Sequence, residues 1–235
     1  MIIKDEGLII YSKVIKEKNL LVKILSKYNG LCVGIIYGGN SKKNKVYYQI
    51  GNFINFNLLN KNENSISSIS GEITSPLVSN FYNNKIKLYA ILTCCSLINI
   101  CINENQKFKN IYNKTYKFFI LLNQKHWFND FADWLLNLLS ELGYGFDWND
   151  INNRKKYLDL TNFQFIDYIK DSNLSKNYIE FPYNLIINKI LDYKECNLMF
   201  LLFENIIKHH LLDHSSKKIP SIYFDFKKII LDKLN

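Results

Sequence analysis

Short apolar runs separated by polar turns fill the first 75 residues and predict strands rather than helices. In the stretch from 53 to 58, Ile54, Phe56 and Leu58 alternate with Phe53, Asn55 and Asn57, which is the period-two pattern of a half-buried strand. Asn29-Gly30 is a strong signal for a turn between two strands. The pattern predicts five strands, at 7–15, 19–28, 31–39, 50–59 and 65–73.

The pattern changes to helical spacing after Pro76. Longer apolar runs predict helices over residues 81–103, 107–122, 126–143, 195–212 and 221–234. In the third of these, one stripe carries Trp127, Phe131, Trp134, Leu138 and Leu142, and Gly143 is placed to end the helix. Residues 144–184 are polar and irregular, with room only for short helical or strand pieces.

These elements predict a mixed α+β protein. Five short strands joined by tight turns within about 70 residues favour a small closed barrel of the OB-fold type. We therefore expect an OB-fold domain over residues 1–75, packed on an all-helical domain over residues 76–235 with an irregular insert near 144–184.

Positive charge is concentrated in the strand-rich segment. The chain of 235 residues has a formal net charge of +9, with 30 Lys and Arg against 21 Asp and Glu. Ten lysines and three acids lie within residues 1–61, so this quarter of the chain carries a net charge of +7 and the remaining residues only +2. Such a basic module favours an acidic partner, most simply nucleic acid.

The densest basic cluster follows a glycine pair in "GGNSKKNK", residues 38–45. Lys42, Lys43 and Lys45 have no acid nearby in the sequence, and unpaired cations of this kind bind phosphate groups. Tyr47 and Tyr48 follow at once and are candidates for stacking on bases, with core packing as the open alternative. Core packing is favoured for Phe56.

The sequence shows no catalytic or metal-binding motif. It has no GxSxG, P-loop, HExxH or dinucleotide-binding glycine pattern, and the adjacent Asp5 and Glu6 would point to opposite faces of a strand. His210 and His214 are four residues apart, but surface or capping roles are favoured over a metal site. The five cysteines have no paired spacing, and Cys94, Cys95 and Cys101 fall in an apolar helical run that indicates core packing.

No targeting segment is recognisable either. The apolar run in "MIIKDEGLII" is too short for a signal peptide, and no stretch reaches the roughly 20 apolar residues of a membrane span. We therefore expect a cytoplasmic protein without a membrane partner.

Four segments, in order along the chain, resemble the RecO family of bacterial recombination mediators. They are "DEGLII" at 5–10, "GGNSKKNKVYYQIGNFINFNL" at 38–58, "LLNLLSELGYGFD" at 135–147, and "IIKHHLL" at 206–212 followed by "KKIP" at 217–220. The second matches a family pattern in which a GGRSRR-like loop precedes "QPGN".

The resemblance implies a DNA repair and recombination protein that is not an enzyme and needs no cofactor. Such proteins bind single- and double-stranded DNA, anneal complementary strands coated with single-stranded-DNA-binding protein (SSB), and with RecR help to load RecA, which implies a cytoplasmic, nucleoid-associated location. By this analogy a DNA-binding surface would consist of Lys42, Lys43, Lys45, Lys13, Lys23, Lys27, Tyr47 and Tyr48. The acidic C-terminal tail of SSB would bind in the helical domain, at Lys208, His209, Lys217 and Lys218.

Two departures from the family pattern change the expectations. Many relatives carry a four-cysteine zinc module after the "LGYxLD" segment, but the position of its first cysteine is Ile151 here and residues 149–168 contain none. We therefore expect no zinc, and a 148–184 region folded around its own aromatic residues. Asn40, Lys42 and Lys43 stand where arginines are common, so charge is kept but bidentate geometry is lost.

Two alternative functions would also be consistent with a basic barrel. An RNA-binding OB-fold module would explain the charge and the aromatic residues but not the helical half. A protein-binding scaffold would use the same surface against an acidic protein. A nucleic-acid binder should lose affinity steeply with salt, and only an annealing factor should speed the pairing of SSB-coated strands.

Overall fold

The computed structural model describes residues 2–60, 66–104, 106–108, 110–146, 156–167, 177–209 and 217–235. Contacts divide the chain into two units. The first comprises residues 1–120 and 220–226, and the second residues 121–219 and 227–235.

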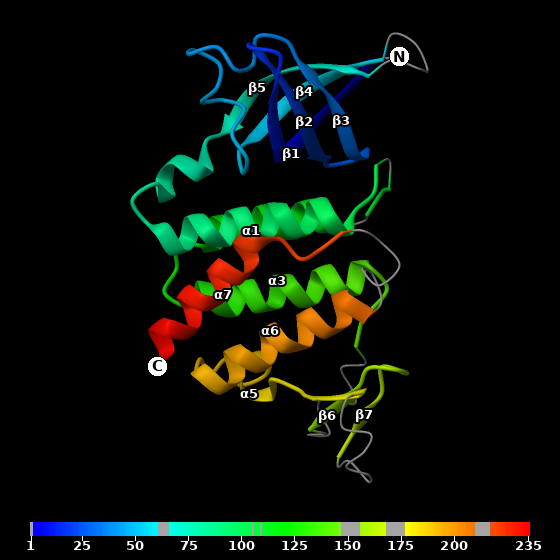
Figure 1. Cartoon of the computed structure of the whole chain (residues 1–235), viewed down its shortest axis with the longest axis vertical. Coiled ribbons are helices and arrows are strands. Elements are labelled where there is room, and N and C mark those ends of the chain that lie inside the picture. The colour runs from blue at the N-terminus through cyan, green and yellow to red at the C-terminus, as the bar shows by residue number, and fades with distance from the viewer. Residues whose placement is uncertain are drawn as a thin grey trace. The chain divides into compact units, whose positions relative to one another are not determined.

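Five strands of the first unit close into a barrel (Figure 1). They are β1 (Ile2–Ile15), β2 (Asn19–Ser26), β3 (Gly30–Ile36), β4 (Phe53–Leu59) and β5 (Ser68–Ser75). The order around the barrel is β1-β2-β3-β5-β4, with β3 and β5 parallel and the other pairs antiparallel. This is a five-stranded OB-fold arrangement, and the predicted α+β class is confirmed.

The long strand β1 closes the barrel by pairing on both sides. Residues 2–8 pair with β4, whereas residues 7–15 pair with β2, with a register shift between Ile9 and Tyr11. The two pairings overlap at Gly7 and Leu8, and Gly7 lies opposite both Ser26 and Ile54. A Cβ atom at Gly7 would lie 2.2 Å from Ile24 Cγ2, so only glycine fits where the strand changes partner.

The alternating pattern of β4 appears in the barrel as predicted. Ile54 and Phe56 are buried inside it, in a core cluster with residues of all five strands, and Asn55 and Asn57 are exposed. Phe56 is thus a core residue, as expected from the sequence.

Phe53, which points out of the barrel, is buried by a helix instead. Its side chain is only 1% exposed because rings of α2 (Ile111–Leu121) surround it, with centroid distances of 5.8 Å to Tyr112, 5.0 Å to Tyr116 and 5.9 Å to Phe119. All three pairs meet edge to face, the arrangement that aromatic rings prefer.

The 3₁₀ helix η1 (Leu77–Phe81) and helix α1 (Lys85–Cys101) follow the barrel. The side chain of Asn84 caps α1 by accepting a hydrogen bond from the backbone N–H of Lys87. α1 lies along one end of the barrel (Figure 1). The Cys95 thiol of this helix approaches the carbonyl oxygen of Ile9. All five cysteines are buried free thiols, which confirms core packing for Cys94, Cys95 and Cys101.

The second unit contains α3 (Trp127–Glu141), α5 (Tyr183–Ile186), α6 (Tyr193–Ile207) and the C-terminal part of α7 (Ser221–Leu234). α3 ends as predicted: Gly143 has φ +95°, and the backbone N–H groups of Gly143 and Tyr144 donate to Ser140 and Leu139. An ion pair of 2.7 Å between Lys227 and the buried Glu204 joins α7 to α6.

The polar region from 144 to 184 contains a small sheet that periodicity did not predict as a unit. Strands β6 (Tyr157–Asp159), β7 (Phe165–Ile166) and β8 (Tyr178–Glu180) pair antiparallel in the order β7-β6-β8. Phe165 and Phe181 pack at 5.0 Å, and Phe146 contacts both rings. For its described residues, the expected folding of this region around its own aromatic side chains is confirmed.

The barrel strands end at Ser75, close to the expected domain boundary, but the first compact unit extends through α1 and α2. The division into domains at residue 75 stays a prediction. Among the described helices, none is long and apolar enough to cross a membrane.

We predict that Phe53→Ala lowers the free energy of unfolding by about 3–5 kcal/mol, because it leaves a cavity between β4 and α2. Urea denaturation followed by circular dichroism measures the change. Tyr37→Ala is the control, since this side chain is 67% exposed and its loss should change stability by at most about 0.5 kcal/mol. Equal effects of the two substitutions would contradict the packing described.

Candidate nucleic-acid interface

The basic cluster lies in a series of turns between β3 and β4, residues 37–52. Lys42, Lys43 and Lys45 are all exposed there. Among the described residues, no carboxylate forms a salt bridge with their ammonium groups, and the salt bridges found there involve other lysines. Their positive charges are therefore directed to solvent, as the sequence predicted for this segment.

Asparagine side chains hold this loop in place. The Asn44 amide donates to the carbonyl oxygen of Gly38 at 3.2 Å. Asn52, which is 3% exposed, donates to the carbonyl oxygens of Val46 and Tyr47, both at 3.2 Å. Because these bonds join amides to backbone carbonyls, the loop conformation does not depend on charge pairing.

The loop also binds the turn between β1 and β2. The backbone N–H of Asn40 donates to the carbonyl oxygen of Lys18 at 2.9 Å, and its side-chain amide donates to that of Glu17 at 3.1 Å. These bonds place the exposed Lys16 and Lys18 beside the loop. Sequence reasoning missed these two lysines because they lie more than twenty positions away, although their place in a hairpin turn was a usable signal.

Two further candidates lie on the strand surface. Lys13 of β1 is exposed and pairs with Leu21, and Lys23 of β2 pairs with Tyr11. The Lys23 ammonium lies 5.9 Å from the centre of the Tyr11 ring, a cation–π distance. Lys13 and Lys23 thus lie on the two strands of the hairpin whose turn carries Lys16 and Lys18.

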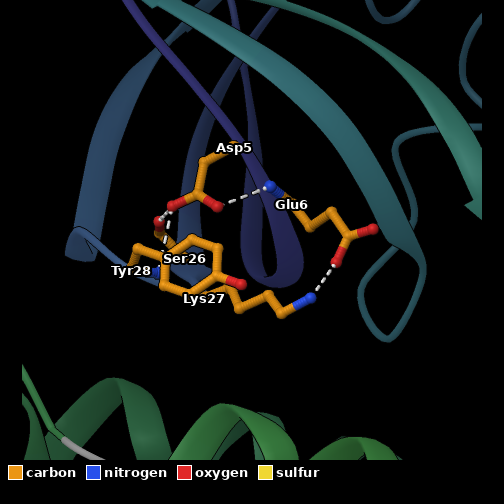
Figure 2. Close-up of polar contacts among 5 residues, drawn as sticks. All are labelled: Asp5, Glu6, Ser26, Lys27 and Tyr28. Atoms are coloured by element: carbon orange, nitrogen blue, oxygen red, sulfur yellow. Dashed lines mark hydrogen bonds and ion pairs between the residues drawn. The ribbon is translucent and has the colours of Figure 1, made fainter.

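Lys27 has a different environment, shown in Figure 2. Its ammonium forms an ion pair of 2.8 Å with Glu6 and lies 5.4 Å from the ring centre of Tyr28. The hydrogen bond that Lys27 donates to the Glu6 carboxylate raises the pKa of Lys27 and favours its charged form. Lys27 is therefore already neutralised by a carboxylate, unlike the lysines of the loop.

Asp5 stabilises the corner of the barrel formed by the β2–β3 turn, next to Lys27 (Figure 2). Its carboxylate accepts hydrogen bonds from the backbone N–H groups of Glu6 at 2.8 Å and Tyr28 at 3.0 Å. It also accepts from the Asn29 amide at 2.8 Å and from the Ser26 hydroxyl. Asp5 and Glu6 thus bond to different residues of the β2–β3 turn, although both carboxylates line the same groove.

An open groove of about 680 Å³ runs along this corner. Its charged lining residues are Asp5, Glu6 and Glu72 with Lys4 and Lys27, so acids outnumber lysines by three to two. This surface is less favourable to phosphate than the loop at residues 37–52.

The two tyrosines after the basic loop have different environments. Tyr47 is 41% exposed, so part of its ring faces solvent. Tyr48 is half-buried against the barrel core, and its hydroxyl donates to the carbonyl oxygen of Gly71 at 2.8 Å. Burial raises the pKa of Tyr48, which keeps the hydroxyl protonated as a donor.

The residues expected to bind an acidic peptide lie after α6 in the chain. Lys208 caps this helix, His209 follows it, and Lys217 and Lys218 begin the next described segment. All four side chains are exposed. His210 and His214 lie outside the described residues, as does Ile151.

The described residues contain no group of three or more His, Cys, Asp or Glu side chains that could hold a metal ion. What the described surface offers is a set of fixed, exposed cations at one end of a barrel, which suits binding of polyanions.

Family comparison matches both halves of the chain. A model described as "Recombination protein O N terminal" matches residues 1–77, and one described as "Recombination protein O C terminal" matches residues 83–183. The chain belongs to the RecO family. The resemblance noted from the four sequence segments is thereby confirmed.

Curated RecO relatives named "DNA repair protein RecO" show moderate similarity. The protein of Rickettsia canadensis is 31% identical over 147 residues, and that of Rickettsia bellii is 32% identical over 148. In both cases the match covers 63% of this chain and 61% of the relative. The matched stretch is thus less than two thirds of the length of these relatives.

We predict that Asp5→Asn lowers the free energy of unfolding by about 1–3 kcal/mol, because it replaces a carboxylate that accepts four hydrogen bonds. Glu6→Gln is the matched control: it removes the same charge from the next residue but breaks only a solvent-exposed ion pair, which contributes little to stability. Urea denaturation compares the two variants. A larger loss for Glu6→Gln would contradict the role given to Asp5.

Proposed function

We propose that this RecO-family chain acts in DNA repair by binding DNA through the end of its barrel. The observation that carries the proposal is the convergence of the loop at residues 37–52 and the β1–β2 turn, joined by the hydrogen bonds of Asn40. Exposed lysines from two separate segments, Lys42, Lys43, Lys45, Lys16 and Lys18, then form one basic surface. The name of the Rickettsia relatives, "DNA repair protein RecO", supports the same role.

The lysines act by neutralising phosphate groups. Each contact releases condensed counterions, and this gain does not depend on base sequence. Lysine is a compact charge without the planar fork of arginine, so this surface suits attraction and alignment of strands rather than recognition of a fixed phosphate geometry. Lys13 and Lys23 extend the surface along the hairpin, whereas Lys27 contributes less because Glu6 is already bonded to it.

In the finer form of the proposal, the protein is a non-enzymatic mediator. It binds single- and double-stranded DNA, anneals complementary strands coated with SSB, and with RecR promotes RecA loading at gaps, at the nucleoid in the cytoplasm. Lys208, His209, Lys217 and Lys218 receive the acidic tail of SSB, since exposed cations near a helix end complement both the acidic groups and the helix dipole.

We predict that Lys42→Glu/Lys43→Glu/Lys45→Glu abolishes annealing of complementary oligonucleotides pre-coated with the cognate SSB, because charge reversal repels phosphate. Wild type should accelerate annealing, measured by fluorescence energy transfer between labelled strands. Lys114→Glu/Lys117→Glu/Lys228→Glu changes the net charge equally on exposed helix positions and should retain activity.

Three results would change this view. Annealing that survives in the loop variant would keep the mediator role but move the DNA site. Loss of annealing in both triple variants would assign the effect to net charge alone. Wild type that fails to accelerate annealing, with SSB confirmed on the strands, would refute the mediator proposal.

We further predict that Lys16→Gln/Lys18→Gln lowers the salt dependence of DNA binding, because two phosphate contacts are lost. The slope of log affinity against log salt concentration should fall by about 1.4 for single strands. Fluorescence anisotropy titrations at several salt concentrations measure the slope, with Lys114→Gln/Lys117→Gln as the control. An unchanged slope in the turn variant would exclude Lys16 and Lys18 from the surface.

A further inference from the structure

A second groove of the first unit lies directly beside the basic loop. Its volume is about 370 Å³, within the range of roughly 300–1,000 Å³ typical of small-ligand sites. Six apolar side chains form much of its lining: Val14, Leu20, Ile50, Val78, Leu88 and Leu92. They come from β1, β2, the end of the loop, η1 and α1.

Two tyrosines also line this apolar groove, and hydrogen bonds hold both. The Tyr82 hydroxyl donates to the side-chain oxygen of Gln49, which belongs to the same lining. The Tyr48 hydroxyl donates to Gly71. Tyr82 is nevertheless 52% exposed, so its ring is both fixed and accessible.

The polar rim of the apolar groove carries a cation. Lys45 of the basic loop lines it together with Asn40 and Ser12. Among the described residues that line this groove, none is acidic. By contrast, the groove of about 680 Å³ described above, here called the acidic groove, has Asp5, Glu6 and Glu72 in its lining.

We propose that the apolar groove receives a nucleobase of single-stranded DNA, with the adjoining phosphate at Lys45. This inference rests on the proposed function and adds how the site would distinguish single strands from duplex. The occupant must pair a flat apolar face with an adjacent anion, which matches an unpaired nucleotide. A tyrosine ring offers a stacking surface, and stacking tolerates any base because every base has a π-face.

The groove would act only on strands whose bases are free. Bases in a duplex are stacked on their neighbours, and removing one from the stack costs a few kcal/mol. The lysines contact phosphate in either form of DNA, whereas the groove adds affinity for unpaired bases alone. The protein would thereby hold separate strands more tightly than the duplex that annealing produces.

The test compares two oligonucleotides of equal length and charge at fixed salt. One is an ordinary single strand, and the other carries abasic tetrahydrofuran units on the same phosphate backbone. Fluorescence anisotropy measures affinity for each. Wild type should bind the base-bearing strand about tenfold more tightly, in line with the 1–3 kcal/mol known for stacking of one base.

Two variants remove the groove by different means. Tyr82→Ala deletes the accessible ring, and Val14→Trp fills the groove from a side chain that is 50% exposed. Both should reduce the preference for the base-bearing strand to less than about threefold while leaving affinity for the abasic strand unchanged. Tyr28→Ala is the matched control, because this tyrosine is 69% exposed and lines the other groove.

The outcomes separate the two proposals. Equal affinity of wild type for both strands, with the expected salt dependence, would overturn the base-binding groove and leave the proposed function intact. A wild-type preference that persists in Tyr82→Ala and Val14→Trp but disappears in Tyr28→Ala would overturn it by placing the bases in the acidic groove. Failure of wild type to bind either strand would refute DNA binding itself.

Discussion

The arrangement of the basic surface depends on the double pairing of β1. This strand bonds to β4 along its first half and to β2 along its second, which leaves the barrel without an unpaired edge. Gly7 makes the change of partner possible, because any side chain would collide with Ile24. Closure fixes the direction of the β1–β2 hairpin, and the turn of this hairpin is what the loop at residues 37–52 binds.

Charge is separated on the surface of the closed barrel. The strands that meet at the acidic groove present Asp5, Glu6 and Glu72, and the hydrogen bonds of Asp5 show that some of these acids are needed for the β2–β3 turn. The lysines of the loop lie away from them, beside an apolar groove without acids among its described lining. A polyanion is therefore attracted more strongly beside these lysines than at the acidic groove, and Glu17 is an exposed acid in the β1–β2 turn, between Lys16 and Lys18.

The sequence predicted what depends on local pattern. Period-two alternation identified β4, and α7 begins at Ser221 and ends at Leu234 as its periodicity indicated. Gly143 was correctly placed as the end of α3 because its conformation is set by neighbours one to four residues away. The exposure of Lys42, Lys43 and Lys45 was expected from the same local pattern, whereas their role in binding nucleic acid stays a prediction.

Features that depend on tertiary contacts were not predictable from such patterns. Lys27 was counted with the free cations because its partner, Glu6, is 21 positions away and reaches it only through the register of β1 and β2. Lys16 and Lys18 were overlooked because Asn40 brings them to the loop from a distant segment. The sheet of β6, β7 and β8 has strands of two or three residues, too short for any period to show.

The amide bonds of the basic loop have a thermodynamic consequence. Asn44 and Asn52 hold the backbone by donating three hydrogen bonds to carbonyl oxygens, and none of these bonds depends on a net charge that added salt would screen. A flexible lysine-rich loop would lose backbone entropy each time it met a ligand, at a cost of about 1–2 kcal/mol for every residue that became ordered. Here that ordering is completed when the chain folds. Added salt then weakens only the attraction between charges, and the lysines keep their spacing while a strand dissociates and another takes its place.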